Sequence, residues 1–245
     1  MISASISSLP AAESVLAMGE LLVPRNYFGR LCLNKGMPKI VDHRQRRAQI
    51  ADSVLAIITE EGVSGVTIRD VAERSGWSTG VLSHYVGSRD DLLQLAFRQA
   101  FLLSGRRLAA IAEESELDPI ERLTRVLTAQ IPLDGPSIAF SRITLFFYAE
   151  AASSPEKLGQ DMINYLSSWR STVHAHVHAA LIFRDLPTSR AREIADYLVA
   201  LTDGYASYEV LGSNLWNGGD PAVPPPVRTW VESALAMSSL DPLQR

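Results

Sequence analysis

Apolar residues recur at helical spacing along most of this chain, from about residue 43 onwards. In the first such run, Ile50, Val54 and Ile57 would share one face of a helix. Gly62 comes at the end of the run, and glycine favours the left-handed backbone with which many helices end. The pattern therefore predicts an amphipathic helix that stops just before Gly62.

Two shorter helical patterns follow, with a tight turn between them. Thr67 can cap the start of the first pattern through its hydroxyl, and Asp70 lies where a reciprocal cap belongs. Gly76 breaks this pattern, and Ser78 begins the second one. Two short helices, here of about eight and about seven residues, joined by a turn that contains glycine are typical of a helix-turn-helix.

The second short pattern has an apolar and a polar side. Val81, Leu82 and Tyr85 are expected behind the helix, against the rest of the domain. The small residues 78–80 would allow its N-terminal end to enter a major groove about 12 Å wide. This arrangement predicts contact with double-stranded DNA.

Helical patterns continue toward the C-terminal end. Ser88 begins a long one, and Asp118 precedes Pro119 at the start of another. No strand pattern and no internal repeat is evident, so we expect an all-α protein. The other helices are expected at residues 118–130, 137–152, 155–183, 189–211 and 227–237, with loops at 132–136 and 217–226.

The first 36 residues show little sustained periodicity. They contain Ser-rich and Pro-interrupted stretches, which favour a poorly ordered extension. Met37 begins the segment that looks like the usual start of such a domain, so a misassigned start codon is the alternative. We expect a DNA-binding domain at residues 37–87 and a larger domain at residues 88–245.

The charge distribution is compatible with DNA binding although the net charge of the 245 residues is −4. Residues 37–100 hold eight Lys/Arg and eight Asp/Glu, whereas residues 101–245 carry a net charge of −5. Residues 37–47 carry four Lys/Arg against one Asp, a local charge of +3. Phosphate contact needs such a local positive face rather than a basic protein, although a solvated face is the alternative. The candidates for a phosphate-contacting arm are Arg44, Arg46 and Arg47.

Two compositional features bear on the compartment. The single cysteine, Cys32, excludes an internal disulfide, which agrees with a reducing cytoplasm. No run of eighteen or more apolar residues occurs, and the N-terminal pattern is not that of a signal peptide. We therefore expect a cytoplasmic protein.

The helix-turn-helix segment also resembles a known family. The signature of TetR-type repressors is similar to residues 76–93, which read Gly-Trp-Ser-Thr-Gly-Val-Leu-Ser-His-Tyr-Val-Gly-Ser-Arg-Asp-Asp-Leu-Leu. The upstream residues 67–76, Thr-Ile-Arg-Asp-Val-Ala-Glu-Arg-Ser-Gly, fit the same signature. The Leu-Ser-His-Tyr piece looks most similar to the branch of choline-responsive, BetI-like repressors. The departures are Trp77 for a small apolar residue, Ser83 for tyrosine and Val86 for phenylalanine.

The resemblance implies roles for individual residues. It implies three N-terminal helices for DNA, followed by a larger helical domain for ligand binding and dimerisation. Thr67 would cap the second helix and touch phosphate, and Arg89, at the position of the family's usual lysine, would contact phosphate. Ser78, Thr79, Gly80 and Ser83 would face the groove, and His84 and Tyr85 would lie against the DNA backbone.

Aromatic and histidine side chains of the C-terminal part are candidates for an effector pocket. Aromatic residues at helical spacing more often pack in a core, which is the alternative for each of them. His174 and His178 lie four residues apart, but no acidic or cysteine partner follows at a metal-binding spacing, so we expect no metal site. The ligand-binding candidates are Phe146, Phe147, Trp169, His174, His178, Tyr205 and Tyr208.

Together these patterns predict a dimeric repressor that a small molecule releases from a pseudo-palindromic operator. The dimer would form through helices around Ala191–Leu211 and Val227–Met237. No nucleophile elbow, P-loop or dinucleotide loop occurs, so we expect neither an enzyme nor a cofactor. The alternatives are a ligand-dependent activator or a corepressor-dependent regulator and, from another class, a helical ligand carrier or enzyme with a degenerate helix-turn-helix.

Overall fold

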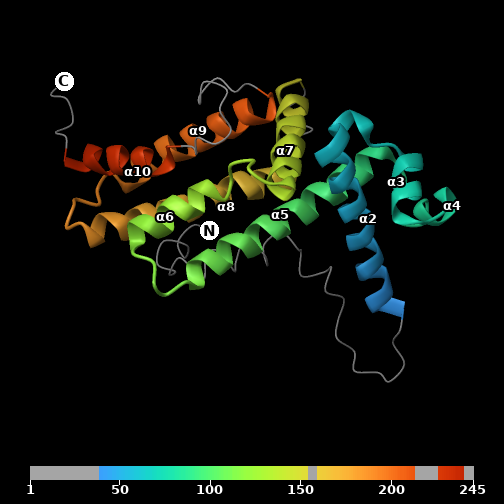
Figure 1. Ribbon diagram of the computed structural model, residues 1–245, viewed down its shortest axis with the longest axis horizontal. Helices are drawn as coiled ribbons and strands as arrows, with labels where there is room; N and C mark the ends of the chain where they lie inside the picture. Colours follow the sequence, from blue (N-terminus) through green and yellow to red (C-terminus); the bar gives the residue numbers. More distant parts are fainter. Residues whose placement is uncertain (1–38, 154–158, 213–225, 240–245) are drawn as a thin grey trace, which may run out of the picture. The chain divides into compact units, whose positions relative to one another are not determined.

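The protein is all-helical in the part of the chain that its computed structural model describes, which is residues 39–153, 159–212 and 226–239. This confirms the predicted fold class. None of the described helices is long and apolar enough to cross a membrane. The α-helices are α2 (Lys39–Glu61), α3 (Ile68–Ser75), α4 (Thr79–Leu82), α5 (Arg89–Glu113), α6 (Pro119–Thr128), α7 (Gly135–Ser153), α8 (Gln160–Phe183), α9 (Ala191–Val210) and α10 (Val227–Ala236), with 3-10 turns at Val63–Gly65 and Met237–Ser239 (Figure 1).

The chain divides into two compact units. The helix-turn-helix unit comprises the described residues of 39–103 and 132–162, and the C-terminal unit comprises those of 104–131 and 163–239. The long helix α5 contributes its first part to the former and its last part to the latter. The helix α7 is distant in the sequence from the short helices α3 and α4, but it belongs to the same compact unit.

The helix-turn-helix unit is built around α2, which packs against α3 and α7. Ile50, Ile57 and Ile58 of α2 are almost completely buried, as their spacing predicts. Gly62 directly follows α2 with a φ of 80° and a ψ of 178°, a backbone conformation that is open to glycine and ends the helix. The predicted stop of the first helix is therefore confirmed.

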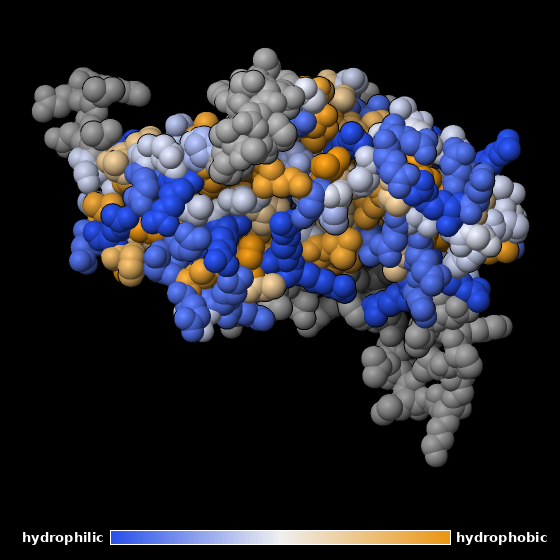
Figure 2. Space-filling model, viewed as in Figure 1, coloured by the Kyte–Doolittle hydropathy of each residue, from blue (hydrophilic) through white to orange (hydrophobic). Residues whose placement is uncertain are grey.

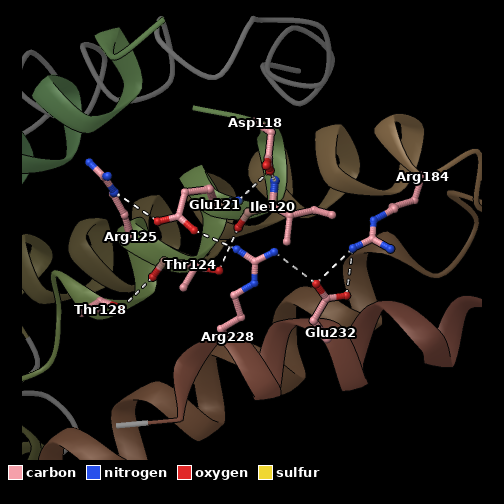
Figure 3. A network of polar contacts seen from close by, with 9 residues as sticks. All are labelled: Asp118, Ile120, Glu121, Thr124, Arg125, Thr128, Arg184, Arg228 and Glu232. Atoms are coloured by element: carbon pink, nitrogen blue, oxygen red, sulfur yellow. Dashed lines mark hydrogen bonds and ion pairs between the residues drawn. The ribbon is translucent and has the colours of Figure 1, made fainter. Parts of the chain in front are cut away.

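The C-terminal unit contains α6, α9 and α10 in mutual contact, with α8 beside α9. Figure 3 shows how Arg228 of α10 reaches Glu121 of α6 at 2.9 Å, while Glu232 accepts from Arg184 at 3.0 Å. The carboxylate of Asp118 accepts from two backbone N–H groups at the start of α6. Partly exposed ion pairs contribute at most about 1 kcal/mol each, so burial of the apolar faces stabilises this unit more than the network does.

The predicted boundaries of α4 and α8 differ from the structure. The helix α4 spans four residues rather than about seven, because the N–H groups of His84 and Tyr85 bond to carbonyls three residues back and tighten the chain into turns. The helix α8 begins at Gln160 instead of residue 155, which itself lies outside the described residues. The predicted N-terminal extension at 1–36 and nearly all of the loop at 217–226 also lie outside them.

Candidate DNA interface and effector site

The turn between α3 and α4 has the geometry of a helix-turn-helix. The Thr67 hydroxyl accepts from the Asp70 N–H at 3.2 Å and caps α3, and the Ser78 hydroxyl caps α4 through the Val81 N–H at the same distance. Gly76 has a φ of 74°, and the N–H of the following Trp77 donates to the Ala72 carbonyl at 3.0 Å. These bonds close α3 with a left-handed residue and redirect the chain into α4.

The helix α4 presents small polar side chains to solvent. The Leu82 side chain is fully buried, and it anchors the helix. Val81 is 39% exposed, so the expectation that it lies behind the helix is wrong; it is about 100° from Leu82 around the helix axis. Hydrophilic residues predominate over α3 and α4 in Figure 2. The exposed surface of this segment contains Ser78, Thr79, Gly80, Val81, Ser83 and His84.

An aromatic cluster joins the turn after α4 to the N-terminal part of α2. The ring of Tyr85 packs on Trp77 at 5.8 Å and on His43 at 5.5 Å between ring centroids. Arg46 donates to the Tyr85 hydroxyl at 3.2 Å, and its guanidinium lies 5.9 Å from the Trp77 ring. Trp77, a departure from the family signature, thus has a packing partner that the sequence did not identify.

The three arginines of the predicted arm lie in α2. Arg44 is exposed, and Arg46 and Arg47 are half-buried. Because Arg46 belongs to the Tyr85 cluster, any phosphate contact through its guanidinium would be oriented by that cluster. Thr67, at the start of α3, is exposed as the predicted phosphate contact requires.

Two other arginines donate to backbone carbonyls, one in the segment between α2 and α3 and one at the end of α2. Arg89 donates from Nε to the Val66 carbonyl at 2.9 Å and from Nη2 to the Val63 carbonyl at 2.6 Å. Arg142 of α7 donates from Nη1 to the carbonyls of Ile58 and Thr59 at 2.8 and 2.6 Å. A cation at the C-terminal end of α2 is also favoured by the helix dipole. Side chains of α5 and α7 therefore hold the stretch of chain that leads from the end of α2 into the helix-turn-helix.

Removing Arg142 should weaken this unit. Arg142→Ala leaves two carbonyls at the end of α2 without their donor, so we expect the free energy of unfolding to fall by about 1.5–3 kcal/mol. Arg142→Lys keeps the charge and one donor and should lose less. Urea denaturation followed by circular dichroism measures this. Arg106→Ala, at an exposed position of α5, is the control, and an Arg142→Ala protein as stable as this control would contradict the role.

The C-terminal unit contains a buried indole beside a carboxylate. The Trp169 side chain of α8 is 1% exposed, and its N–H makes no hydrogen bond of ordinary geometry within the described residues. Burial raises the pKa of Asp203 on α9 to about 6, while the nearby Trp169 N–H acts to lower it. The indole of α8 and the carboxylate of α9 are therefore neighbours in this unit.

The other predicted aromatic residues fall into different surroundings. Phe146 and Phe147 belong to α7 in the helix-turn-helix unit, where Phe147 packs edge-on against Phe97 and Phe146 lies 6.0 Å from the Arg89 guanidinium. Tyr205 is buried in the C-terminal unit with its ring 5.3 Å from that of Trp230. Tyr208 is 44% exposed on the surface of α9.

The three histidines of α8 differ in burial. His174 and His178 share a face with ring centroids 6.3 Å apart, but within the described residues no group of three His, Cys, Asp or Glu could hold a metal ion. Burial lowers the pKa of His174, and the nearby charges of Arg192 and His178 lower it further. Burial lowers the pKa of His176 to about 4, so this ring is neutral at pH 7.

Comparison with known proteins agrees with this geometry. The family "Bacterial regulatory proteins, tetR family" matches residues 50–96, and "BetI-type transcriptional repressor, C-terminal" matches residues 119–218. The HTH-type transcriptional regulator BetI of Burkholderia cenocepacia (strain HI2424) is 32% identical over 173 residues, covering 69% of this chain and 84% of that protein. The chain belongs to the tetR family.

Solved structures of tetR-type proteins have the same fold. A transcriptional regulator from Rhodococcus sp. Rha1 is 26% identical, covers 78% of this chain and 95% of its own, and gives a TM-score of 0.58. A regulator from Saccharomonospora viridis, solved in complex with choline, is 22% identical with a TM-score of 0.66, and the match covers 79% of this chain and 96% of that one. This tetR-family protein is thus a ligand-responsive, DNA-binding transcriptional regulator, as its sequence predicts.

Reasoning from the sequence missed three residues of this regulator that the structure brings forward. Val81 lies among the exposed residues of α4, Arg142 holds the end of α2, and Asp203 lies beside Trp169. Only Asp203 carried a usable signal, because it is an acidic residue within an apolar stretch of α9. The role of Arg142 depends on a contact between distant segments. The exposure of Val81 depends on which side of the short helix α4 faces the core.

Proposed function

We propose that this tetR-family regulator is a homodimeric repressor that leaves its operator when a small molecule binds the C-terminal unit. The observation that carries the proposal is the exposed face of α4, in which short polar side chains surround a buried Leu82 anchor. Two such helices in one dimer would enter major grooves about 34 Å apart on a pseudo-palindromic site.

Base contacts are assigned to the middle of that face. The Thr79 and Ser83 hydroxyls can donate to or accept from base edges, and the exposed Val81 methyl groups suit contact with a thymine methyl. Ser83 also donates to the Thr79 carbonyl at 2.9 Å, so its hydroxyl oxygen is oriented to accept. Gly80 allows close approach to the groove.

Phosphate contacts are assigned to the edges of the same surface. Arg89 uses Nε and Nη2 within the protein, and its Nη1, which has no hydrogen-bond partner within the described residues, is the group proposed to reach phosphate. Contacts to phosphate position the protein but carry little sequence information. The proposed set is Arg44, Arg46, Arg47, Thr67, Ser78, His84, Tyr85 and Arg89.

Substitutions at Thr79 and Ser83 test the groove assignment. Thr79→Ala and Ser83→Ala should change the preferred bases at the contacted positions, with discrimination there falling by about fivefold to 150-fold, because a base contact contributes about 1–3 kcal/mol. Selection from random DNA, followed by fluorescence anisotropy on the selected sites, measures this. Ser53→Ala on α2 is the control, and recovery of an identical site for all variants would contradict the assignment.

Dimerisation is assigned to α9 together with α10. Tyr197, Leu201, Gly204 and Tyr208 lie on one face of α9 at spacings of four, three and four residues, and both tyrosines are more than 40% exposed. A Cβ atom placed on Gly204 would meet no atom within 4 Å, so a second helix could approach there. This face lies about 90° around α9 from Leu198 of the buried stripe and supports a helix-to-helix interface between protomers.

The effector is proposed to be a small organic cation. The choline complex of the Saccharomonospora viridis regulator supports this class, since that protein has the same fold. A ligand that binds the released conformation more tightly shifts the population toward it. Operator DNA titrated with and without choline would test this, since tighter binding with choline would instead favour corepression. We also propose that the protein acts in the cytoplasm, where operator DNA lies.

A further inference from the structure

The Trp77 ring contacts two of the side chains proposed to meet DNA phosphate. It packs on the Tyr85 ring with 5.8 Å between ring centroids, and the Arg46 guanidinium lies 5.9 Å from its own centroid. Trp77 is half-buried, whereas Leu82, the anchor of α4, is fully buried. The indole therefore belongs to the partly exposed surface of the motif rather than to its core.

Backbone hydrogen bonds fix the positions of both rings. The Trp77 N–H donates to the Ala72 carbonyl at 3.0 Å, and the next residue, Ser78, caps α4. The Tyr85 N–H donates to the Leu82 carbonyl at 2.8 Å, just beyond the end of that helix. The two rings thus come from opposite ends of α4 and pack on each other, so their placement depends on the motif itself.

Arg46 differs from the two rings, because its long side chain keeps much rotamer freedom unless neighbours hold it. It lies in the first half of α2 and reaches the rings from a different helix. Its Nη1 donates to the Tyr85 hydroxyl at 3.2 Å, while the guanidinium lies over the Trp77 ring. Phenol and indole are uncharged, so these two contacts restrict the guanidinium without neutralising it.

We propose that Trp77 is a positioning residue for operator binding, which holds the Arg46 guanidinium in the orientation that meets a backbone phosphate of the operator. This rests on the proposed function, because it assigns how one of the proposed phosphate contacts is prepared. A side chain that is already oriented loses less conformational freedom on binding, so the gain is in affinity. Phosphate contacts carry little sequence information, so base preference should not depend on Trp77.

A double-mutant cycle on operator binding tests this coupling. Trp77→Val should weaken operator binding about two- to tenfold, the range expected for ordering one long side chain on binding. Arg46→Ala should weaken it about tenfold at about 0.1 M salt and reduce the salt slope of the affinity by about 1. The double variant should bind no more than about twofold more weakly than Arg46→Ala alone, because Trp77 then has no guanidinium to orient.

Two further readouts separate orientation from a merely structural role. Trp77→Val should keep the salt slope and the base preference of the unaltered protein, since the phosphate contact still forms and α4 keeps its place. Trp77→Phe keeps an aromatic face and should restore the affinity to within about twofold of the unaltered protein. Urea denaturation shows which variants fold, and Trp77→Leu replaces Trp77→Val in the cycle if the latter does not.

Arg44 provides a matched control cycle. It is exposed on the same helix but lies about 160° around the axis from Arg46, away from the side that faces Trp77. The losses caused by Trp77→Val and Arg44→Ala should therefore add within about twofold.

The proposal is overturned if Trp77→Val binds as tightly as the unaltered protein, if its base preference changes, or if its loss adds to that of Arg46→Ala. Sites selected from random DNA with the unaltered protein keep this separate from the proposed function. Binding to such sites with additive losses in the cycle removes only the role of Trp77. Absence of any selected site removes the proposed repressor, and this inference with it.

Discussion

Leu82→Ala should lower the free energy of unfolding of the helix-turn-helix unit by about 2–5 kcal/mol and abolish specific operator binding. Leu82 is fully buried, and it is the buried anchor of a helix only four residues long. A helix of this length is not stable by itself, so its orientation depends on tertiary packing. Loss of the anchor therefore removes both burial energy and the alignment of the exposed hydroxyls.

The neighbouring residue provides a matched control. Val81 is one position away on the same short helix but is 39% exposed. Val81→Ala removes a similar amount of apolar side chain, yet stability should change by no more than about 0.5 kcal/mol, as is usual for surface substitutions. Its effect should be confined to operator affinity, through the lost contact of its methyl groups with bases.

Urea denaturation and operator anisotropy on both variants measure these effects. Hydrogen exchange of the amides in α3 and α4 reports whether α4 has come loose or the whole unit has been destabilised. Equal stability of the two variants, or operator binding retained by Leu82→Ala, would show that α4 is not held by this anchor.

Charging the exposed face of α9 should have the second large effect. Tyr197→Lys combined with Tyr208→Lys places two cations on the face proposed to meet its copy in the partner, so like charges would be buried against each other in a dimer. We expect a monomer. Operator affinity should fall at least about 100-fold, because a monomer cannot use the second half-site and loses the effective concentration of the linked pair.

Sedimentation velocity and operator anisotropy on one preparation test this pair of expectations. Arg192→Glu is the control, since Arg192 is exposed on α9 but points well away from the two tyrosines. A double variant that remains a dimer would place the interface elsewhere. A monomer with undiminished operator affinity would instead show that dimerisation is not needed for operator binding.

The sequence predicted those elements whose chemistry is local. The caps at Thr67, Ser78 and Asp118 involve hydroxyl or carboxylate groups and N–H groups two or three residues away. Gly62 and Gly76 have positive φ angles, which cost glycine little because it has no side chain. The helix-turn-helix and the family assignment followed from this local pattern together with its spacing.

Only the tertiary structure decided where the ligand-site candidates lie. Phe146 and Trp169 are both aromatic residues in helices, but the former packs beside Arg89 in the helix-turn-helix unit, whereas the latter is buried against α9. Their partners are distant in the chain: Arg89 lies 57 residues before Phe146, and Asp203 lies 34 residues after Trp169. Helical spacing fixes which residues share a face but not which other helix covers that face.

Packing between distant segments also decided the surroundings of Arg89, Arg142 and Val81. Arg89 follows the family signature, yet its bonds to the Val63 and Val66 carbonyls depend on how α5 meets the segment before α3. Arg142 reaches a helix end 83 residues earlier in the chain. Val81 is exposed because it lies about 100° around α4 from Leu82, the residue that is buried. By itself the sequence thus determined the helices, their caps and the DNA-binding motif, since hydrogen bonds within a few residues specify them. The environment of each side chain was decided by packing between segments far apart in the chain.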